Sequence, residues 1–204
     1  MRRVHHGDTY NGMKLSSSYK NNDGFYIEIL ESIQLAFEYM LDKHSKVFFT
    51  SFVIKFPTGS KYAVPWDNSL FSRFVEAFIL DCKRKGYGQI YLWTREESTT
   101  GQVHYHLILL FNGNVIQNAH GILDKATKLW QGCLGVTDGK GLVHLCESGD
   151  GENRYGGINI RRHEAGFQEN YYKCFESASY LAKCYSKDKV PIYTNQFSRS
   201  RLPK

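Results

Sequence analysis

Long apolar stretches are missing from this sequence. The longest apolar runs, such as Leu107 to Phe111, are far shorter than the ~20 residues that span a bilayer. No apolar core follows Arg2 and Arg3, so the start of the chain does not resemble a secretory signal. We therefore expect a soluble cytoplasmic protein that has no membrane contact.

Two motifs that define function classes are also missing. The five cysteines include no Cys-x-x-Cys pair, and an odd number cannot all be bridged within one chain, which favours reduced thiols. The stretch nearest to a phosphate-binding loop, residues 135–141 (GVTDGKG), is one residue short and lacks the Ser or Thr that follows the lysine. This absence excludes ATP-driven helicase activity by the chain.

The residues that are present fit one globular domain. Of the 204 residues, 42% are apolar and 15% are aromatic, which is enough to bury a core without help from a disulfide or a metal. The composition excludes a disordered, collagen-like or coiled-coil chain. We expect a flexible basic lead-in over residues 1–20, the domain over residues 21–190 and a basic tail over residues 191–204.

The positive charge lies at the two ends of the chain. Residues 1–20 contain four basic residues and one acidic residue, and residues 183–204 contain six basic residues and one acidic residue. The segment between them contains 16 basic and 18 acidic residues, so the net charge of +6 comes from the ends. Basic ends can contact phosphates and release counterions, although many soluble domains also carry them.

Periodicity predicts helices that alternate with strands. Apolar residues recur at helical spacing in four segments: residues 26–41, 67–86, 119–131 and 167–187. β-Branched and aromatic residues predict five strands: residues 47–56, 89–97, 102–111, 142–146 and 157–162. This order indicates an α+β fold with a mainly antiparallel sheet.

Two histidines in one predicted strand form a candidate metal site. Strand alternation places His104 and His106 on the same face, and two neutral imidazoles are a natural pair of metal ligands. If the loop before them has three residues ending at Gly101, the hairpin register puts Glu96 opposite His104 and Thr94 opposite His106. A carboxylate would then complete a site with three ligands.

Two alternatives remain open for this pattern. A register shifted by one residue would offer Glu97 instead, less favourably, because its side chain would point to the other face. The histidines could also be a half-buried pair that bonds only to its neighbours.

The predicted last helix contains a candidate nucleophile. On a helical wheel, Tyr180, Lys183 and Lys187 lie away from an apolar stripe that includes Tyr185. A phenol near an ammonium and a metal-bound phosphate can lose its proton and attack. We therefore expect Tyr180 to be the nucleophile and Tyr185 to be packed in the core. An exposed tyrosine without a chemical role fits the position of Tyr180 equally well.

Three stretches together resemble the HUH endonucleases, the nickases that start rolling-circle replication or mobilise single-stranded DNA. Residues 47–56 are similar to the first strand motif, residues 104–106 (HYH) to the metal motif, and residues 180–183 (YLAK) to the Y-x-x-K helix. The combination of WTRE, HYHLILLFN and ASYLAK is most similar to the filamentous-phage (inovirus) replication initiators. The resemblance implies an RRM-like sheet that carries the His-x-His strand, with helices packed on it.

The resemblance also implies roles for these residues. His104, His106 and Glu96 would bind magnesium or manganese, Tyr180 would attack the phosphodiester, and Lys183 would assist it. Some members of the superfamily use a second tyrosine. Tyr171, Tyr172 and Tyr185 are not at convincing positions for one, so we expect a single-tyrosine nickase.

The implied partner is single-stranded DNA or an origin hairpin in a bacterial host cell. The host's helicase and polymerase would act with the nickase. Basic residues expected to line the DNA path are Arg161, Arg162, Lys187, Arg199 and Arg201.

Two other functions fit the same residues. A sheet-based binding module would stack the histidines on bases without a covalent step. A zinc hydrolase would use the two histidines with water as the nucleophile. A denaturing gel separates these possibilities, because only a tyrosine nickase leaves protein attached to DNA.

Overall fold

The computed structural model describes residues 3–17, 23–58, 65–146, 156–185, 187 and 194–202. The helices in these ranges are α1 (Ile27–Lys43), α2 (Ser69–Arg84), α3 (His120–Leu134) and α4 (Phe167–Ser179), followed by the 3-10 turn η1 (Tyr180–Ala182). The longer strands are β5 (Lys46–Lys55), β6 (Ile90–Glu97) and β7 (Val103–Asn112). The shorter strands are β1 (Val4–His5), β2 (Thr9–Tyr10), β3 (Met13–Lys14), β4 (Phe25–Tyr26), β8 (Val143–Leu145), β9 (Ile158–Arg161) and β10 (Phe197–Arg199).

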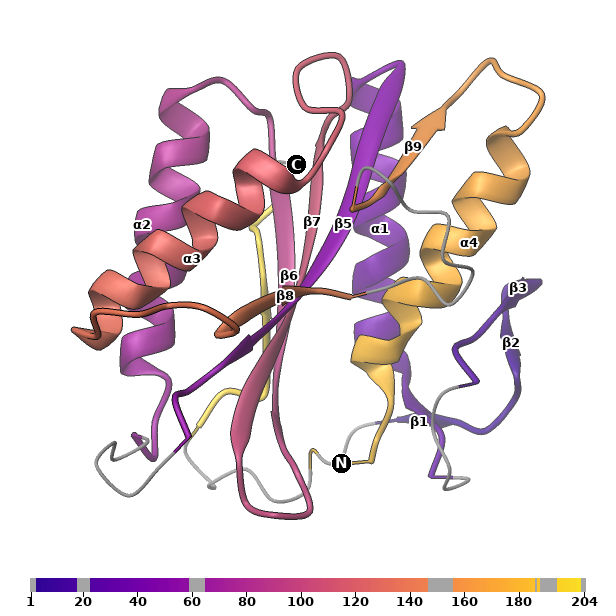
Figure 1. The fold of residues 1–204 in the computed structure, drawn as a ribbon. Coiled ribbons are helices and arrows are strands. Elements are labelled where there is room, and N and C mark those ends of the chain that lie inside the picture. Colours follow the sequence, from indigo (N-terminus) through magenta and orange to yellow (C-terminus); the bar gives the residue numbers. More distant parts are fainter. Residues whose placement is uncertain are drawn as a thin grey trace.

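The central sheet is antiparallel throughout, which confirms the predicted α+β class. Its strand order is β10-β6-β7-β5-β8, and β9 pairs with the other end of β5. The long strands β5, β6 and β7 form the middle of the sheet, and the helices lie on both sides of it (Figure 1).

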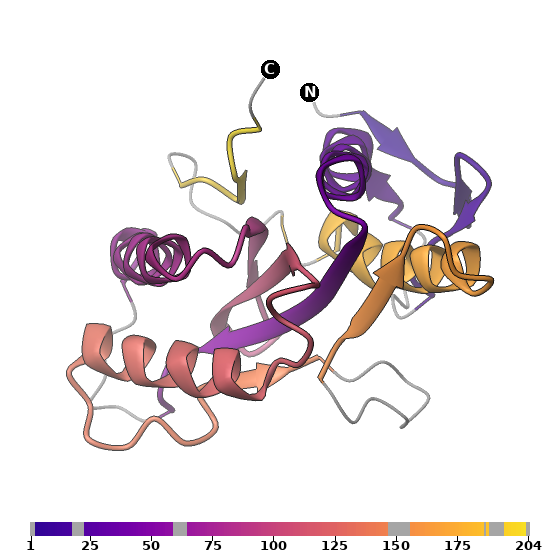
Figure 2. The same cartoon turned by 90° about the horizontal axis from the view of Figure 1, so that it is seen from above.

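Strand alternation divides the core into two layers. On β7, Tyr105, Leu107 and Leu109 pack with α2 and α3, whereas Ile108 and Leu110 pack with α1 and α4. The view from above shows these two pairs of helices on opposite faces of the sheet (Figure 2). His104 and His106 have the same parity as Ile108, so they lie on the α1 and α4 face.

The predicted flexible lead-in differs from the structure. Within residues 3–17, β1 pairs with β4 and β2 pairs with β3. Met13 and Leu15 are 4% and 2% exposed and belong to the same core cluster as residues of α1 and α4. Burial of these two apolar side chains favours docking of the segment on the core.

The predicted basic tail also enters the fold in part. Residues 197–199 form β10, which pairs with the edge of β6, and the Arg95 amide donates a hydrogen bond to the Gln196 carbonyl oxygen at 2.9 Å. Phe197 and Leu202 pack on the α1 and α4 core. Residues 191–193 and 203–204 of this tail lie outside the described residues.

The last helix ends earlier than its periodicity predicts. The α-helix stops at Ser179, η1 adds one tighter turn, and Lys183 is extended with φ −52° and ψ 137°. An isolated bridge pairs Lys183 with Phe25. The wheel holds for Leu181 and Ala182, which are buried, and fails beyond η1: Tyr185, expected in the core, is 37% exposed.

None of the helices among the described residues is long and apolar enough to span a membrane.

Candidate functional site

The β6–β7 hairpin brings the three predicted metal ligands together. The Ser98 amide donates to the Gln102 carbonyl oxygen at 2.9 Å, and Gly101 has φ +78°, the left-handed conformation expected at the end of a three-residue loop. The register pairs Glu96 with His104 and Thr94 with His106, as predicted. Glu97 pairs with Val103, so the alternative register is wrong.

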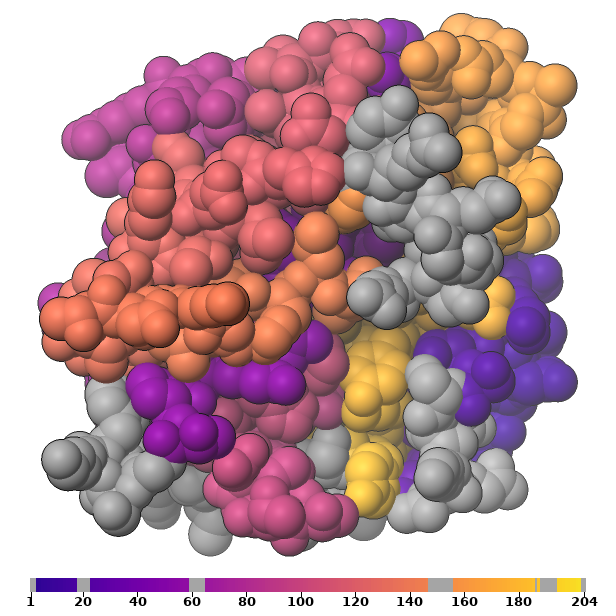
Figure 3. Space-filling model, viewed as in Figure 1, coloured from indigo at the N-terminus to yellow at the C-terminus, as the bar shows by residue number. Residues whose placement is uncertain are grey.

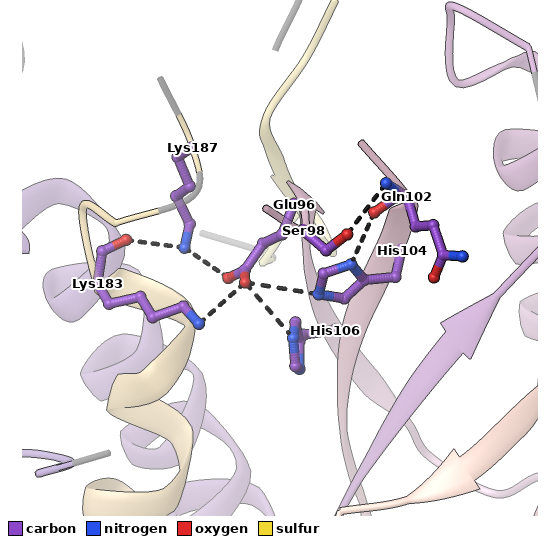
Figure 4. A network of polar contacts seen from close by, with 7 residues as sticks. All are labelled: Glu96, Ser98, Gln102, His104, His106, Lys183 and Lys187. Atoms are coloured by element: carbon purple, nitrogen blue, oxygen red, sulfur yellow. Dashed lines mark hydrogen bonds and ion pairs between the residues drawn. The ribbon is translucent and has the colours of Figure 1, made fainter. Parts of the chain in front are cut away.

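The ligand atoms of the three side chains face one another. Glu96 Oε2 lies 3.7 Å from His104 Nε2 and 3.6 Å from His106 Nε2. One possible ligand atom from each of the three residues lies within 4.8 Å of the other two. The two imidazoles and the carboxylate converge on one point from adjacent strands (Figure 4). This group can hold a metal ion with three protein ligands.

The hydrogen bonds of the histidines leave lone pairs for a cation. His104 Nδ1 lies 3.3 Å from the Gln102 carbonyl oxygen, which can only accept, so Nδ1 carries the proton and Nε2 is free to bind. His106 Nε2 is buried and has no hydrogen-bond partner among the described residues. A divalent ion fits this site because it satisfies acceptor atoms that otherwise face each other.

The pKa shifts of Glu96, His104 and His106 also favour a state that can bind a metal ion. Burial alone would raise the pKa of the Glu96 carboxyl, but the surrounding cations, first of all Lys187, lower it to about 2. Burial lowers the pKa of His106 to about 3 and also lowers that of His104, while Glu96 acts in the opposite direction on both. At neutral pH the site offers one carboxylate and two neutral imidazoles, as metal binding requires.

Two lysines from the segment after α4 complete the charge network. Lys183 Nζ lies 3.0 Å from Glu96 Oε2, and Lys187 Nζ lies 2.8 Å from Glu96 Oε1. They are 5% and 0% exposed, whereas the helical wheel predicted a polar face. The early end of α4 turns both ammonium groups toward the sheet.

Tyr180 lies beside the candidate metal ligands. The centroid of its ring is 4.9 Å from that of His106, and Lys183 Nζ is 3.6 Å from the centroid of the Tyr180 ring. Its side chain is half-buried. The structure therefore joins the predicted nucleophile, the predicted assisting lysine and the predicted metal ligands in one site.

The other three candidate tyrosines, Tyr171, Tyr172 and Tyr185, have different surroundings. Tyr171 packs against Phe37 and Phe167, and burial raises its pKa to about 12. Tyr172 is 38% exposed on α4, and Tyr185 is 37% exposed with its ring centroid 6.0 Å from Lys183 Nζ.

The strand behind the histidines is held firmly from the opposite face. Tyr105, between the two histidines, stacks on Phe71 with centroids 3.6 Å apart and donates a hydrogen bond to Asn68 Oδ1 at 2.9 Å. Arg95, next to Glu96, donates to the same Asn68 oxygen at 3.1 Å. These contacts fix the backbone that positions the ligands.

The predicted DNA-contacting arginines lie at different distances from this site. Arg199 pairs with Leu92 on β6 and shares the face of the metal ligands, and Arg201 is exposed near it in sequence. Arg161 pairs with Lys46, nine positions from Lys55 along β5, or ~30 Å at strand spacing. Arg161 also forms an ion pair with Glu164, and Arg162 is exposed.

Sequence reasoning missed Lys55. This exposed residue on β5 pairs directly with His104, so it stands beside the site on the same face, and its charge contributes to the lowered pKa of His104. The pairing of β5 with β7 joins segments about fifty residues apart, and no local pattern in the sequence predicts its register.

Within the site, His104 and Tyr180 are partly exposed and Lys55 is exposed, whereas Glu96 and His106 are buried. In the space-filling view, the lower end of the β6–β7 hairpin (pink) lies between the end of β5 (purple) and the chain that follows α4 (orange-yellow) (Figure 3).

One family model matches this sequence. It is described as the YagK/YfjJ C-terminal domain and covers residues 6–200. A search of curated proteins finds no match. The matched range contains the hairpin, α4 and the segment with the two lysines, so the whole site lies inside the shared domain.

Proposed function

The chain belongs to the YagK/YfjJ C-terminal domain family, and we propose that it is a metal-dependent endonuclease of the HUH type that nicks single-stranded DNA. The nick would pass through a covalent 5′-phosphotyrosine and start rolling-circle replication at an origin. One observation carries the proposal: the ring of Tyr180 lies against His106 of a metal-ligand triad, with Lys183 over its face.

Glu96, His104 and His106 would hold a magnesium or manganese ion. When bound, the ion would polarise the scissile phosphate and stabilise negative charge on the leaving oxygen. Three protein ligands leave coordination positions for oxygens of the substrate. The Lys187 ammonium orients Glu96 through its hydrogen bond to Oε1. The hydrogen bond from His104 Nδ1 to the Gln102 carbonyl oxygen orients the His104 ring.

Tyr180 would supply the nucleophile. Its hydroxyl oxygen forms a bond to phosphorus, the bond from phosphorus to the 3′ oxygen breaks, and the phenolic proton ends on the released 3′-hydroxyl. The number of phosphodiester bonds is unchanged, so no nucleotide cofactor is required. A later 3′-hydroxyl can reverse the step and rejoin a strand.

Lys183 would assist Tyr180 through charge. Its ammonium lies close to both the Tyr180 ring and Glu96 Oε2, so it would stabilise the negative charge that develops during attack on the phosphate. In this proposal, strand separation and synthesis would come from the host helicase and polymerase.

The test is a search for a covalent adduct. The protein is incubated with manganese and a library of labelled single-stranded oligonucleotides, and the products are run on a denaturing gel. We expect a labelled protein band that is lost in Tyr180→Phe and in the double variant His104→Ala, His106→Ala. Tyr180→Phe removes one hydroxyl, so its Tm and DNA affinity should stay unchanged.

Tyr185→Phe is the matched control, because the Tyr185 ring also lies near Lys183 Nζ, whereas the ring packed against His106 is that of Tyr180. Its adduct should remain. An adduct mapped to Tyr171, Tyr172 or Tyr185 contradicts the role of Tyr180. Binding without an adduct on any substrate identifies a binding module, and zinc-dependent cleavage that survives Tyr180→Phe identifies a hydrolase that uses water.

A further inference from the structure

Lys187 is a buried lysine that joins three parts of the site. Its ammonium lies 2.8 Å from Glu96 Oε1 and donates a hydrogen bond to the Lys183 carbonyl oxygen at 2.8 Å. Its own carbonyl oxygen accepts a hydrogen bond from Gln196 Nε2 at 2.7 Å. Lys187 thus connects the ligand strand β6, the segment that follows Tyr180 and the segment before β10.

These contacts differ from those of a DNA-binding lysine. Lys187 is 0% exposed, whereas a phosphate contact requires an accessible ammonium. The role expected from the sequence therefore does not fit its place in the fold, and its partners indicate another.

The two oxygens of Glu96 have separate partners. Oε1 is held by Lys187, and Oε2 faces His104, His106 and the ammonium of Lys183 (Figure 4). A cation between the histidines meets Oε2, where it competes with Lys183, while Lys187 occupies Oε1. Lys187 therefore limits Glu96 to one-oxygen coordination.

The positive charge around this carboxylate exceeds its negative charge, which weakens the binding of a metal cation. One buried carboxylate already meets two ammonium groups, and the neutral histidines add no negative charge. A divalent cation would add to this positive charge over a few ångströms, where Coulomb repulsion is strong. A phosphate of a bound DNA strand supplies the missing negative charge.

We propose that Lys187 is a positioning residue that reserves one oxygen of Glu96 and couples metal binding to DNA binding. The protein alone binds the metal weakly, and a DNA phosphate in the site strengthens that binding. By linkage, the metal strengthens DNA binding by the same factor. The inference rests on the proposed function, since it concerns the same metal and the same phosphate.

A purely structural role for Lys187 gives the opposite expectation. If the lysine only neutralised a buried carboxylate, its loss would disturb Glu96 and weaken metal binding. The two roles therefore differ in the sign of the change in metal affinity.

The experiment measures Mn²⁺ affinity by calorimetry, with and without a mixed-sequence single-stranded oligonucleotide. All proteins carry Tyr180→Phe so that no DNA is cleaved. Lys187→Met should bind Mn²⁺ roughly tenfold more tightly than the parent without DNA, and DNA should strengthen its binding less. Lys173→Met is the control, because Lys173 is an exposed α4 lysine that pairs with Glu169; its affinities should match the parent.

A second readout reports the coordination of Glu96. Once Lys187 is gone, both carboxylate oxygens can reach the ion and displace a bound water, so water-proton relaxation by bound Mn²⁺ should fall in Lys187→Met. Equal or weaker Mn²⁺ affinity in this variant overturns the proposal.

If Lys187→Met does not fold by circular dichroism, Lys187→Gln replaces it, because Gln keeps a hydrogen-bond donor without the charge. Tighter Mn²⁺ binding by Lys187→Gln then supports the proposal, and equal or weaker binding overturns it. No readout requires cleavage, so a missing adduct in the unmodified protein refutes the nickase alone, and unchanged affinity in the variant refutes the coupling alone.

Discussion

The Glu96 carboxylate contacts the other charged and titratable groups of the site. It is 1% exposed, yet two ammonium groups and two imidazoles surround it. Removing one partner of a buried ion pair typically costs about 3–5 kcal/mol, because the remaining charge stays uncompensated. Substitutions at Glu96 therefore change the fold and the chemistry together, and the histidines are better single probes.

The lowered pKa of His106 predicts that acid destabilises the metal-free protein. The folded state has a pKa of about 3 against an ordinary value of 6.5, so below 6.5 the unfolded chain binds a proton that the folded protein does not. The free energy of unfolding should fall from pH 6.5 toward 3, by up to about 1.4 kcal/mol per pH unit. Urea unfolding in a chelator, repeated across this range, measures the slope.

His106→Asn should reduce this slope between pH 6.5 and 4.5. Below that, Glu96 still contributes, because its pKa falls from 4.5 to about 2 on folding and its stabilisation is lost as acid protonates it. His163→Asn is the control, since His163 is exposed in the turn before α4 and should leave the slope unchanged. The assignment fails if His106→Asn keeps the slope of the unmodified protein.

At the scale of elements, the hairpin and the strand beside it place the residues of the candidate site. The three-residue loop fixes Glu96 opposite His104, and β5 then adds Lys55 to the same row. Because Lys183 and Lys187 are both held by Glu96, Lys55 is an accessible cation next to the ligands, and it can contact a DNA phosphate.

We predict that Lys55→Ala weakens the affinity for single-stranded DNA. The slope of log affinity against log salt should fall in magnitude by roughly 0.7, the value for one lost phosphate contact. Mn²⁺ affinity should not fall, since Lys55 is not a ligand. Fluorescence anisotropy across a salt series gives the slope. Lys128→Ala, on the exposed side of α3, should bind DNA as the unmodified protein does; an equal loss in both variants would contradict the contact.

The end of α4 is the second element that shapes the site. A helix continued through Lys187 would carry Lys183 and Lys187 on its outer side, away from the sheet. The 3-10 turn and the extended Lys183 redirect the chain, and the bridge to Phe25 holds that change of direction. Tyr180 therefore lies at the end of the helix, where the chain brings Lys183 over its ring.

At the scale of the whole molecule, the two chain ends add to the fold as well as to the charge. Residues 4–14 supply β1, β2 and β3, and β10 extends the sheet next to the ligand strand β6. The basic residues at the C-terminal end are thus attached to a strand that covers the edge of β6.

We predict that charge and structure can be separated in this segment. Arg199→Ala with Arg201→Ala should lower the magnitude of the salt slope for DNA binding with little change in Tm. Deletion of residues 191–204 should also lower Tm, because it uncovers β6 and removes the packing of Phe197 and Leu202. Thermal unfolding and anisotropy compare the variants; an equal Tm for the deletion and the unmodified protein would exclude the structural contribution of β10.

The sequence by itself determined the parts of the site that depend on local geometry. Strand alternation sets His104 and His106 on one face, and the length of the loop closed by Gly101 brings Glu96 opposite them, so these relations follow from neighbouring residues. The tertiary structure alone decided the places of Lys55, Lys183 and Lys187. Lys55 reaches the site through a long-range strand pairing, and the two lysines are buried because α4 stops at Ser179 and its continuation pairs with Phe25. Helical periodicity extends a helix for as long as its pattern lasts, whereas the chain ends it where packing against distant segments and a buried carboxylate stabilise another path.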